Sequence, residues 1–412
     1  MPKALYICYF GLREPLVQTQ VIPYLRELIK DGVAMCLLTF EPQIRESWSA
    51  DEIAAEKEKL AQTGIDWHCL GYHKSPSAIA TAYDIFRGTV FVRRMIGRGN
   101  FDILHGRVHI PTLMGALARR FSGKKPKLLF DIRGFFPEEY TDAGIWPENG
   151  WLYRSAKCVE KWLLKESDGF VVLTEKAREI LFPGSKESGS DANGRPVEVI
   201  PCCVDIERFD AVTDTERNEM RQKLGVEGRK VFVYVGSFGG WYLTDEMFDL
   251  FAAARDADPN IFVMILTQRQ ADLATQRMLD NGFGENDFLV RTVSPVEIPG
   301  YLNAADLAVS FIKNCYSKQA SSPTKNAECL AAGLPIIANS GIGDVDSLIV
   351  ADGVGVLIDT FDRESYLNAI AGLTELGDIA NKCRETAKLR FDLVSVGGVR
   401  YRRLYNRLLQ SK

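Results

Sequence analysis

The chain has 412 residues, 46% hydrophobic and 25% charged, so length and composition indicate a globular protein of two or three domains. The net charge of −4 gives no general reason to bind nucleic acid. No apolar run approaches the roughly 20 residues of a membrane span, and the N-terminus lacks a signal-peptide pattern. The nine cysteines are scattered without a Cys-x-x-Cys pair, as is typical of reduced thiols in a cytoplasmic protein.

In the first half, short β-branched runs alternate with amphipathic helical patterns. The predicted strands are residues 4–10, 34–40, 101–106, 127–133, 169–174 and 197–201. The predicted helices between them are residues 18–30, 77–96, 111–121 and 151–166, and the polar stretch 183–196 is predicted as a surface loop. This alternation predicts a parallel sheet covered by helices.

The same pattern restarts near residue 200 and ends in an amphipathic helix. Six more strands are predicted at residues 230–236, 261–266, 287–292, 306–312, 334–339 and 353–358. In the tail, one face is formed by Leu404, Tyr405, Leu408 and Leu409. We therefore predict an N-terminal domain over residues 1–202, a second over 203–390, and a tail, 391–412, that packs back on the first.

Glycine-containing turns follow the leading strand of each half. Gly11-Leu12 and Gly236-Ser237 lie where parallel strands end, which is where ligands bind in open α/β sheets. Neither has dinucleotide-binding spacing, and no P-loop or grouped metal ligands are present. Two such turns in matching places predict a phosphate-bearing ligand and no metal.

The stretch "SSPTKNAECLAAGLPIIAN", residues 321–339, predicts a helix with Ser322 as N-cap and Pro323 in the first helical position. Lys325 then lies in the first turn, where the helix dipole disfavours a cation unless an anion is shared there. Glu328 lies one turn later on the same face. The alternative is a plain surface pair, worth about 0.2–0.5 kcal/mol.

Several segments resemble glycosyltransferase family 4, retaining enzymes of the GT-B fold. They are residues 301–312, 323–339 and 353–358, the hinge-like stretch 199–209, and, more loosely, residues 101–120 and 127–136. The resemblance is to a branch with Ser-Pro-Thr-Lys before the retained glutamate. It implies two Rossmann-like, doubly wound domains facing each other across a cleft, with a C-terminal helix returning to the first. It also implies metal-independent transfer of a sugar, without a separate cofactor, from a nucleotide sugar of the UDP or GDP type.

On this resemblance, Glu328 matches the second glutamate of the E-x7-E motif and is expected to bind the donor ribose. The first glutamate would fall at Ala320, and the usual Arg/Lys pair is absent after residue 235, so Lys325 is the expected substitute at the diphosphate. The expected catalytic residues are Lys325, Arg133 and His105. The expected donor contacts are Glu328, Ser322, Thr324, Gly236, Ser237, Gly11 and Leu12, and the acceptor-side candidates are Arg107, Glu138 and Glu139.

Some of these assignments have structural alternatives. His105 suits a hydrogen-bonded core histidine equally well, and Glu138 and Glu139 suit solvated loop charges. Arginines in residues 87–98 could meet the inner membrane surface, or form a solvated helix face. The expected acceptor is a glycan, a lipid-linked glycan or a small molecule, as in polysaccharide or glycoconjugate synthesis. A nucleotide-sugar epimerase and a catalytically silent nucleotide-sugar-binding protein remain alternatives.

Overall fold

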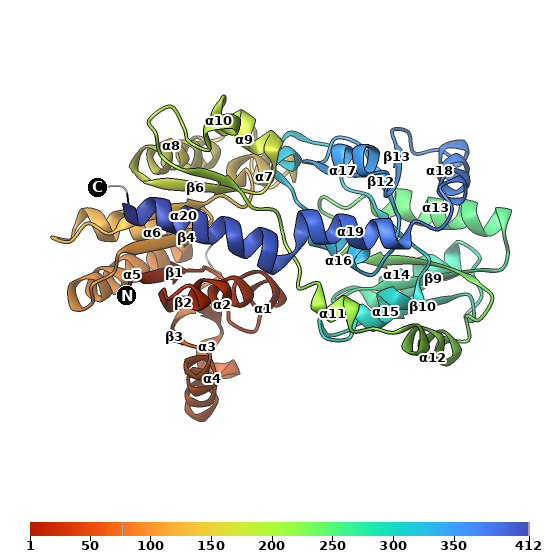
Figure 1. Cartoon of the computed structure of the whole chain (residues 1–412), viewed down its shortest axis with the longest axis horizontal. Helices are drawn as coiled ribbons and strands as arrows, with labels where there is room; N and C mark the ends of the chain where they lie inside the picture. Colours follow the sequence, from red (N-terminus) through yellow and green to blue (C-terminus); the bar gives the residue numbers. More distant parts are fainter. Residues whose placement is uncertain (76, 411–412) are drawn as a thin grey trace. The chain divides into compact units, whose positions relative to one another are not determined.

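The computed structural model describes residues 1–75 and 77–410 and divides into two compact units (Figure 1). Unit 1 comprises Met1–Pro201 together with the segment from Val396 onward, and unit 2 comprises Cys202–Ser395. The chain therefore passes from one unit to the other twice. Residues 411–412 of the predicted tail lie outside the described residues.

Unit 1 contains a parallel sheet of seven strands in the order β3-β2-β1-β4-β5-β6-β7. Its strands are β1 (Lys3–Ile7), β2 (Ala34–Pro42), β3 (Ile65–Tyr72), β4 (Ile103–Arg107), β5 (Lys127–Asp131), β6 (Gly169–Val172) and β7 (Val197–Val199). The parallel α/β plan is confirmed, but β3 was not predicted. β3 lies at the edge of the sheet and, among the described strands, pairs with β2 only. Most of its residues are only half-buried, so its hydrophobic pattern is weak.

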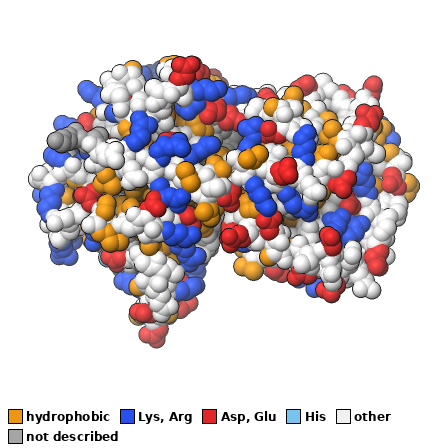
Figure 2. Space-filling view, in the orientation of Figure 1, with side chains coloured by type: hydrophobic (Ala, Val, Ile, Leu, Met, Phe, Trp, Pro, Cys, Tyr) orange, Lys and Arg blue, Asp and Glu red, His pale blue; other side chains and the backbone are white. Residues whose placement is uncertain are grey.

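Helices cover the sheet of unit 1 on both sides. They are α1 (Pro15–Gln20), α2 (Ile22–Lys30), α3 (Ile44–Ser47), α4 (Ala50–Gln62), α5 (Ser77–Arg98), α6 (His109–Arg120), α7 (Phe136–Asp142), α8 (Trp151–Glu166), α9 (Glu175–Leu181), α10 (Ser185–Ser188) and α20 (Val399–Gln410). Helix α6 packs between α5 and α8, whereas α20 packs against α2 and β7. Figure 2 shows Lys and Arg side chains along the outer face of α20.

Unit 2 repeats the doubly wound plan with six parallel strands in the order β10-β9-β8-β11-β12-β13. All six match predicted segments: β8 (Lys230–Val235), β9 (Ile261–Leu266), β10 (Phe288–Arg291), β11 (Leu307–Ser310), β12 (Ile336–Asn339) and β13 (Gly355–Ile358). The helical segments are α11 (Glu207–Asp210), α12 (Asp214–Leu224), α13 (Thr244–Ala257), α14 (Ala271–Asp280), α15 (Ile298–Ala304), η1 (Tyr316–Ala320), α16 (Thr324–Ala331), α17 (Val345–Asp352), α18 (Arg363–Glu375) and α19 (Ala380–Phe391).

A one-turn π-helical segment, η2 (Leu393–Gly398), precedes α20, so the tail is not one continuous α-helix as the pattern predicted. All nine cysteines, each within the described residues, are free thiols. Of the helices described, none combines the length and the apolarity that crossing a bilayer requires.

The buried carboxylate of Asp131 fixes α20 on unit 1. Asp131, at the end of β5, is fully buried and forms an ion pair with Arg133 Nε at 2.9 Å. The Tyr401 hydroxyl of α20 donates to it at 2.9 Å, and His105 Nε2 lies 3.3 Å from it. The Tyr405 hydroxyl lies 2.9 Å from His105 Nδ1. Two tyrosines of the last helix thus complete a charged network in the sheet.

The protonation of this network follows from its surroundings. Burial alone would raise the pKa of Asp131, but Arg133, His105 and Arg107 together hold it well below its usual value. Burial lowers the pKa of His105, although the hydrogen bond and the negative charge of Asp131 act to raise it. The imidazole is therefore neutral, and because the carboxylate only accepts, Nε2 carries the proton and Nδ1 accepts from Tyr405.

We expect Asp131→Asn to lower the free energy of unfolding by about 3–5 kcal/mol, because it leaves Arg133 and Arg107 buried without their charge partner. Tyr405→Phe should cost about 1 kcal/mol. Urea unfolding followed by tryptophan fluorescence measures both, with the exposed Glu148→Gln as control. Since the pKa of Asp131 is depressed in the folded state, its contribution is complete above the unfolded pKa of about 4 and declines as the pH falls below it. Equal stability of Asp131→Asn and the parent would contradict this role.

Candidate functional site

Helix α16 begins at Thr324, one residue later than predicted. Its N-cap is Pro323, which has no side-chain oxygen to accept from the helix. The hydroxyl of Ser322 instead accepts from the backbone N–H of Cys202 at 3.1 Å. The predictions that Ser322 caps the helix and that Pro323 is its first residue were therefore wrong, because the hinge backbone competes for the hydroxyl. Lys325 still lies in the first turn.

The ammonium of Lys325 lies between two aromatic rings. Its Nζ is 4.6 Å from the ring centroid of Tyr234 and 4.6 Å from that of Tyr242. The Nζ is inaccessible to solvent and has no hydrogen-bond partner. Tyr234 is the fifth residue of β8, and Tyr242 forms an isolated bridge with Ile312 beyond β11. A buried donor group without an acceptor is costly, so its presence here needs an explanation.

Glu328 does not pair with this ammonium. The contacts of Lys325 are the two rings, so the alternative of a Lys–Glu surface pair does not describe the structure. Burial lowers the pKa of Lys325 to about 7. Burial likewise raises the pKa of Glu328 to about 7, with Arg208 opposing the shift. Two ionisable groups one turn apart are thus poised near neutrality, which is typical of functional sites.

A second lysine, Lys318, contacts a tryptophan, Trp241, that directly precedes Tyr242 in the sequence. The sequence analysis did not identify either residue. Lys318 of η1 is 6% exposed, and its Nζ lies 4.0 Å from the Trp241 ring centroid. The indole N–H of Trp241 is buried without a partner. The adjacent aromatic residues 241–242, directly after two glycines, were the available signal. Aromatic faces attract cations, so both lysines are held by the same type of contact.

The turn after β8 begins at Gly236, whose positive φ favours glycine. Its backbone N–H already has an acceptor within the protein. Gly236 has φ +146°, and its N–H donates to Leu266 O at 3.0 Å. The Ser237 carbonyl accepts from the Tyr234 hydroxyl at 2.6 Å, which fixes the ring beside Lys325. The backbone of Gly236 therefore does not offer a free donor, whereas the exposed Ser237 side chain stays a candidate contact.

Other polar groups of unit 2 are buried without partners near the start of α16 and the end of β11. The side-chain amide of Asn326, 2% exposed, has no hydrogen bond, and neither has the Ser310 hydroxyl. Asn339 in contrast is satisfied, because its amide bonds to both Ile312 N and Ile312 O, at 2.8 and 2.9 Å. These bonds join the ends of β11 and β12. The unsatisfied groups of Asn326 and Ser310 belong to the same part of unit 2.

The turn at Gly11-Leu12 is occupied by the protein itself. The Leu12 N–H donates to both carboxylate oxygens of buried Glu41, at 2.9 and 3.1 Å. A Cβ at Gly11 would lie 2.8 Å from Pro42 Cδ. The glycine allows close packing, and the Leu12 amide is occupied by a carboxylate of the protein. The assignment of Gly11 and Leu12 to donor binding stays a prediction.

The expected catalytic residues of unit 1 are inside the Asp131 network. His105 is 1% exposed and Arg107 3% exposed, and the Arg133 guanidinium donates to the Tyr401 hydroxyl at 2.7 Å. Arg107 also donates to Tyr6 and to Gln20 O, at 3.4 and 3.3 Å. His105 and Arg107 are thus almost inaccessible to solvent, and their assignment to the transferred sugar or the acceptor stays a prediction. His105 is in the setting of the core-histidine alternative, and Arg133 joins α20 to β5.

The acidic candidates of unit 1 lie in the first turn of α7. Glu138 is 8% exposed and accepts from the Tyr153 hydroxyl at 3.1 Å, and Lys157 forms an ion pair with it at 2.9 Å. Lys157 also pairs with Glu160, which contacts His109 Nε2 at 2.9 Å. Glu138 is therefore part of a buried structural network and not a solvated charge. The Glu139 carboxylate lies against Gly134, where a Cβ would be 2.9 Å from it.

One grouping of potential metal ligands occurs within the described residues. Cys36 Sγ, an Asp66 carboxylate oxygen and a His68 ring nitrogen lie within 4.8 Å of one another on β2 and β3. This group belongs to unit 1 and includes none of the predicted site residues.

The Lys325 amine should titrate near neutral pH in the unliganded protein. Burial disfavours the ammonium, so as the pH rises through about 7 the amine should lose its proton, far below the ordinary pKa of about 10.4. NMR of protein labelled with ¹³Cε-lysine measures this, and the signal is assigned by its absence from Lys325→Met. The two rings oppose the effect of burial. A pKa above about 9 would mean that the two rings offset most of the effect of burial on Lys325.

Two family models match successive parts of the chain. "Glycosyltransferase Family 4" matches residues 17–208, and "Glycosyl transferases group 1" matches residues 216–390. Among curated proteins, the chain is 29% identical to 2-deoxystreptamine glucosyltransferase of Streptomyces kanamyceticus over 232 residues. That match covers 53% of this chain and spans about half, 51%, of the relative's length.

Solved structures resemble the whole chain at low identity. A glycosyltransferase from Rickettsia africae ESF-5 aligns with a TM-score of 0.71 and 14% identity, covering 100% of this chain and 99% of its own. Anabaena Alr3699/HepE in complex with UDP-glucose aligns with a TM-score of 0.69 and 15% identity, covering 98% of this chain and 100% of its own. These structural matches and the two parallel sheets show the GT-B fold. The two family models, which match residues 17–208 and 216–390 in turn, support a glycosyltransferase family 4-like protein.

Proposed function

We propose that the protein is a retaining, metal-independent glycosyltransferase that uses a nucleotide-sugar donor. The observation that carries the proposal is the Lys325 ammonium, buried between Tyr234 and Tyr242 without a hydrogen-bond acceptor in the first turn of α16. A donor diphosphate would supply the missing negative charge at a helix N-terminus. The match of unit 2 residues to the group 1 family model supports the same assignment.

In this proposal Lys325 binds the diphosphate and Glu328 the ribose hydroxyls. A carboxylate accepts from two neighbouring hydroxyls, and one helical turn separates it from the lysine. Ser237, with its exposed side chain, and Thr324, at the start of α16, are the remaining proposed donor contacts. The UDP-glucose complex of the similar Anabaena fold supports a nucleotide sugar of the UDP type as the first donor to test, with GDP sugars next.

Transfer with retention is proposed to occur on the front face of the sugar. The acceptor oxygen bonds to the anomeric carbon as the bond from that carbon to the phosphate oxygen breaks, and the acceptor proton passes to the departing diphosphate. Negative charge grows on the diphosphate during this step. A fixed ammonium there stabilises the transition state more than the bound donor.

A glycan or a lipid-linked glycan is the proposed acceptor, and an anionic membrane surface is the proposed site of encounter. Support comes from α5, where Ile79, Tyr83 and Phe86 are 70%, 50% and 66% exposed and share one helical face with exposed Arg93 and Arg94. Apolar and basic side chains on one face suit a lipid surface. Vesicle co-sedimentation at low salt tests this partner.

Product analysis with UDP-glucose alone separates the rival activities. A sugar isomer would indicate an epimerase, whereas release of UDP and glucose indicates a transferase acting on water. UDP-glucose binding without any turnover across a broad panel of acceptors would favour a silent binding protein. This last reading is prompted by Ala320, which replaces the first glutamate of the motif and is 2% exposed.

Lys325→Met should lower turnover about 10²–10³-fold, with a smaller loss of donor affinity, because the ammonium acts most strongly on the charge of the transition state. Lys325→Arg should recover only part, since a planar fork does not replace a point charge between two rings. Release of UDP from UDP-glucose gives the rate, and calorimetry gives the affinity. Lys223→Met, at an exposed position of unit 2, is the control. Turnover of Lys325→Met equal to that of Lys223→Met would refute the assignment.

Glu328→Ala should weaken UDP and UDP-glucose alike, by roughly 1.5–3 kcal/mol, because the ribose is common to both. Calorimetric titration of each ligand measures the loss. Glu227→Ala removes an exposed carboxylate of the same unit and should leave both affinities unchanged. If only UDP-glucose binding weakened, Glu328 would contact the sugar and not the ribose.

A further inference from the structure

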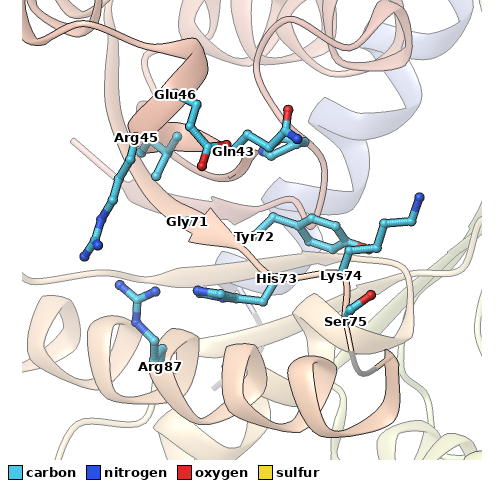
Figure 3. Close-up of a pocket in the computed structure, with 11 residues that line it drawn as sticks. Gln43, Arg45, Glu46, Gly71, Tyr72, His73, Lys74, Ser75 and Arg87 are labelled. Atoms are coloured by element: carbon cyan, nitrogen blue, oxygen red, sulfur yellow. The ribbon is translucent and has the colours of Figure 1, made fainter.

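A pocket of about 610 Å³ opens at the carboxyl ends of β2 and β3 in unit 1 (Figure 3). It is lined by residues 42–46 after β2, by residues 71–75 around the end of β3, and by Arg87 of α5. The functional assignments for unit 2 do not involve it. In parallel α/β sheets, ligands bind outside the carboxyl ends of the strands, although the switch point of this sheet lies between β1 and β4.

The pocket is rich in positive charge. Arg45, Lys74 and Arg87 line it, against the single carboxylate of Glu46. Figure 3 shows the guanidinium groups of Arg45 and Arg87 directed toward one another, with the His73 ring extending toward Arg87, while Lys74 points away. No ion pair of these three cations occurs within the described part of the chain, although carboxylates pair with many other arginines of unit 1. Convergent, unpaired cations are an electrostatic site for an anion.

Two of these groups lie near Gly71, at the end of β3. A Cβ at Gly71 would lie 3.9 Å from Arg87 Nη1, 3.9 Å from His73 Cε1 and 3.2 Å from Ile44 Cγ2. Arg87 and His73 therefore both lie beside this position, on the same side of the strand end. Arg87 is further held by the Tyr83 ring, whose centroid is 5.6 Å from its Cζ.

The His73 ring is fixed from behind by a buried carboxylate. Its Nδ1 lies 2.6 Å from Asp84 Oδ1, and its backbone N–H donates to Asp84 Oδ2 at 2.9 Å. The Tyr9 hydroxyl also donates to Asp84, at 2.9 Å, and Asp84 is fully buried. Because a carboxylate only accepts, Nδ1 carries the proton in this contact, and Nε2 is left for a ligand.

We propose that this pocket binds a phosphate group, and that the phosphate belongs to the acceptor. Arg45 and Arg87 would donate their planar forks to its oxygens, and His73 Nε2 would form a third hydrogen bond with it. A phosphate monoester has three terminal oxygens for these three groups, and the volume exceeds that of an ion, so the remainder of an acceptor fits beside it. Only the link to the acceptor rests on the proposed transferase function.

Titration with inorganic phosphate at constant ionic strength tests the binding. The chain has four histidines, so the ring signals are few, and the His73 signal is identified by its loss in His73→Gln. The His73 signal should shift saturably in ¹⁵N NMR, while those of buried His105 and His109 stay unchanged and report an intact fold. Arg87→Gln and Arg45→Gln should each weaken phosphate about tenfold or more. Arg26→Gln, an exposed arginine that does not line the pocket, should bind like the parent.

Two sources of phosphate are separated by a second measurement. Binding to phosphatidylglycerol vesicles that Arg87→Gln abolishes, without a response to soluble phosphate, would support the phosphate chemistry and assign it to a lipid headgroup. A non-saturating shift, or one equal in Arg26→Gln and Arg87→Gln, would overturn the proposal, as would no response to either probe. UDP titration of the same samples is independent: failure of the parent to bind UDP would refute the donor site and leave the phosphate result standing.

Discussion

The Asp131 carboxylate imposes the constraint on which unit 1 depends. A fully buried negative charge must be paired and hydrogen-bonded, and its partners come from β4, from the residues after β5, and from the last helix. The sheet therefore cannot satisfy its own central charge without Tyr401, some 270 residues further along the chain. This requirement explains why His105, Arg107 and Arg133 are buried although their residue types suggest chemistry. It also explains why α20 belongs to unit 1 and not to the unit that precedes it in sequence.

In unit 2, the buried ammonium of Lys325 has no ion pair or hydrogen bond with any residue that the structure describes. Lys325 has two aromatic faces and no acceptor, and Asn326 and Trp241 also have unsatisfied polar atoms. Such groups lower the stability of the empty protein, and a ligand that satisfies them regains that free energy on binding. The two buried charges therefore differ in their partners: Asp131 has ion pairs and hydrogen bonds within its own unit, whereas Lys325, among the described residues, contacts only two aromatic rings.

The fold was largely predictable from the sequence, and the site only in part. Hydrophobic periodicity predicted every strand except β3, whose half-buried edge position weakens that signal. Lys325 and Glu328 stood out because the charges conflict with the surrounding helix pattern. The sequence could not show which hydrogen-bond partner each polar group would take in the folded chain. The Ser322 hydroxyl bonds to Cys202, the Leu12 amide bonds to Glu41, and His105 is enclosed by α20. Each of these depends on residues distant in sequence that only the folded chain brings together.

The return of α20 to unit 1 has a consequence for synthesis on the ribosome. Asp131 is translated 270 residues before Tyr401, an interval of roughly 15–50 s at about 5–20 residues per second. Once residue 199 has been translated, β1–β7 are complete, but the face that α20 covers is still exposed. Asp131 then lacks the Tyr401 hydroxyl, and His105 lacks the Tyr405 hydroxyl. Unit 2, whose strands all emerge in the meantime, can close first. The N-terminal unit therefore cannot complete its contacts before Tyr401 has been translated, and a nascent chain that stalls before residue 401 exposes the face that α20 covers.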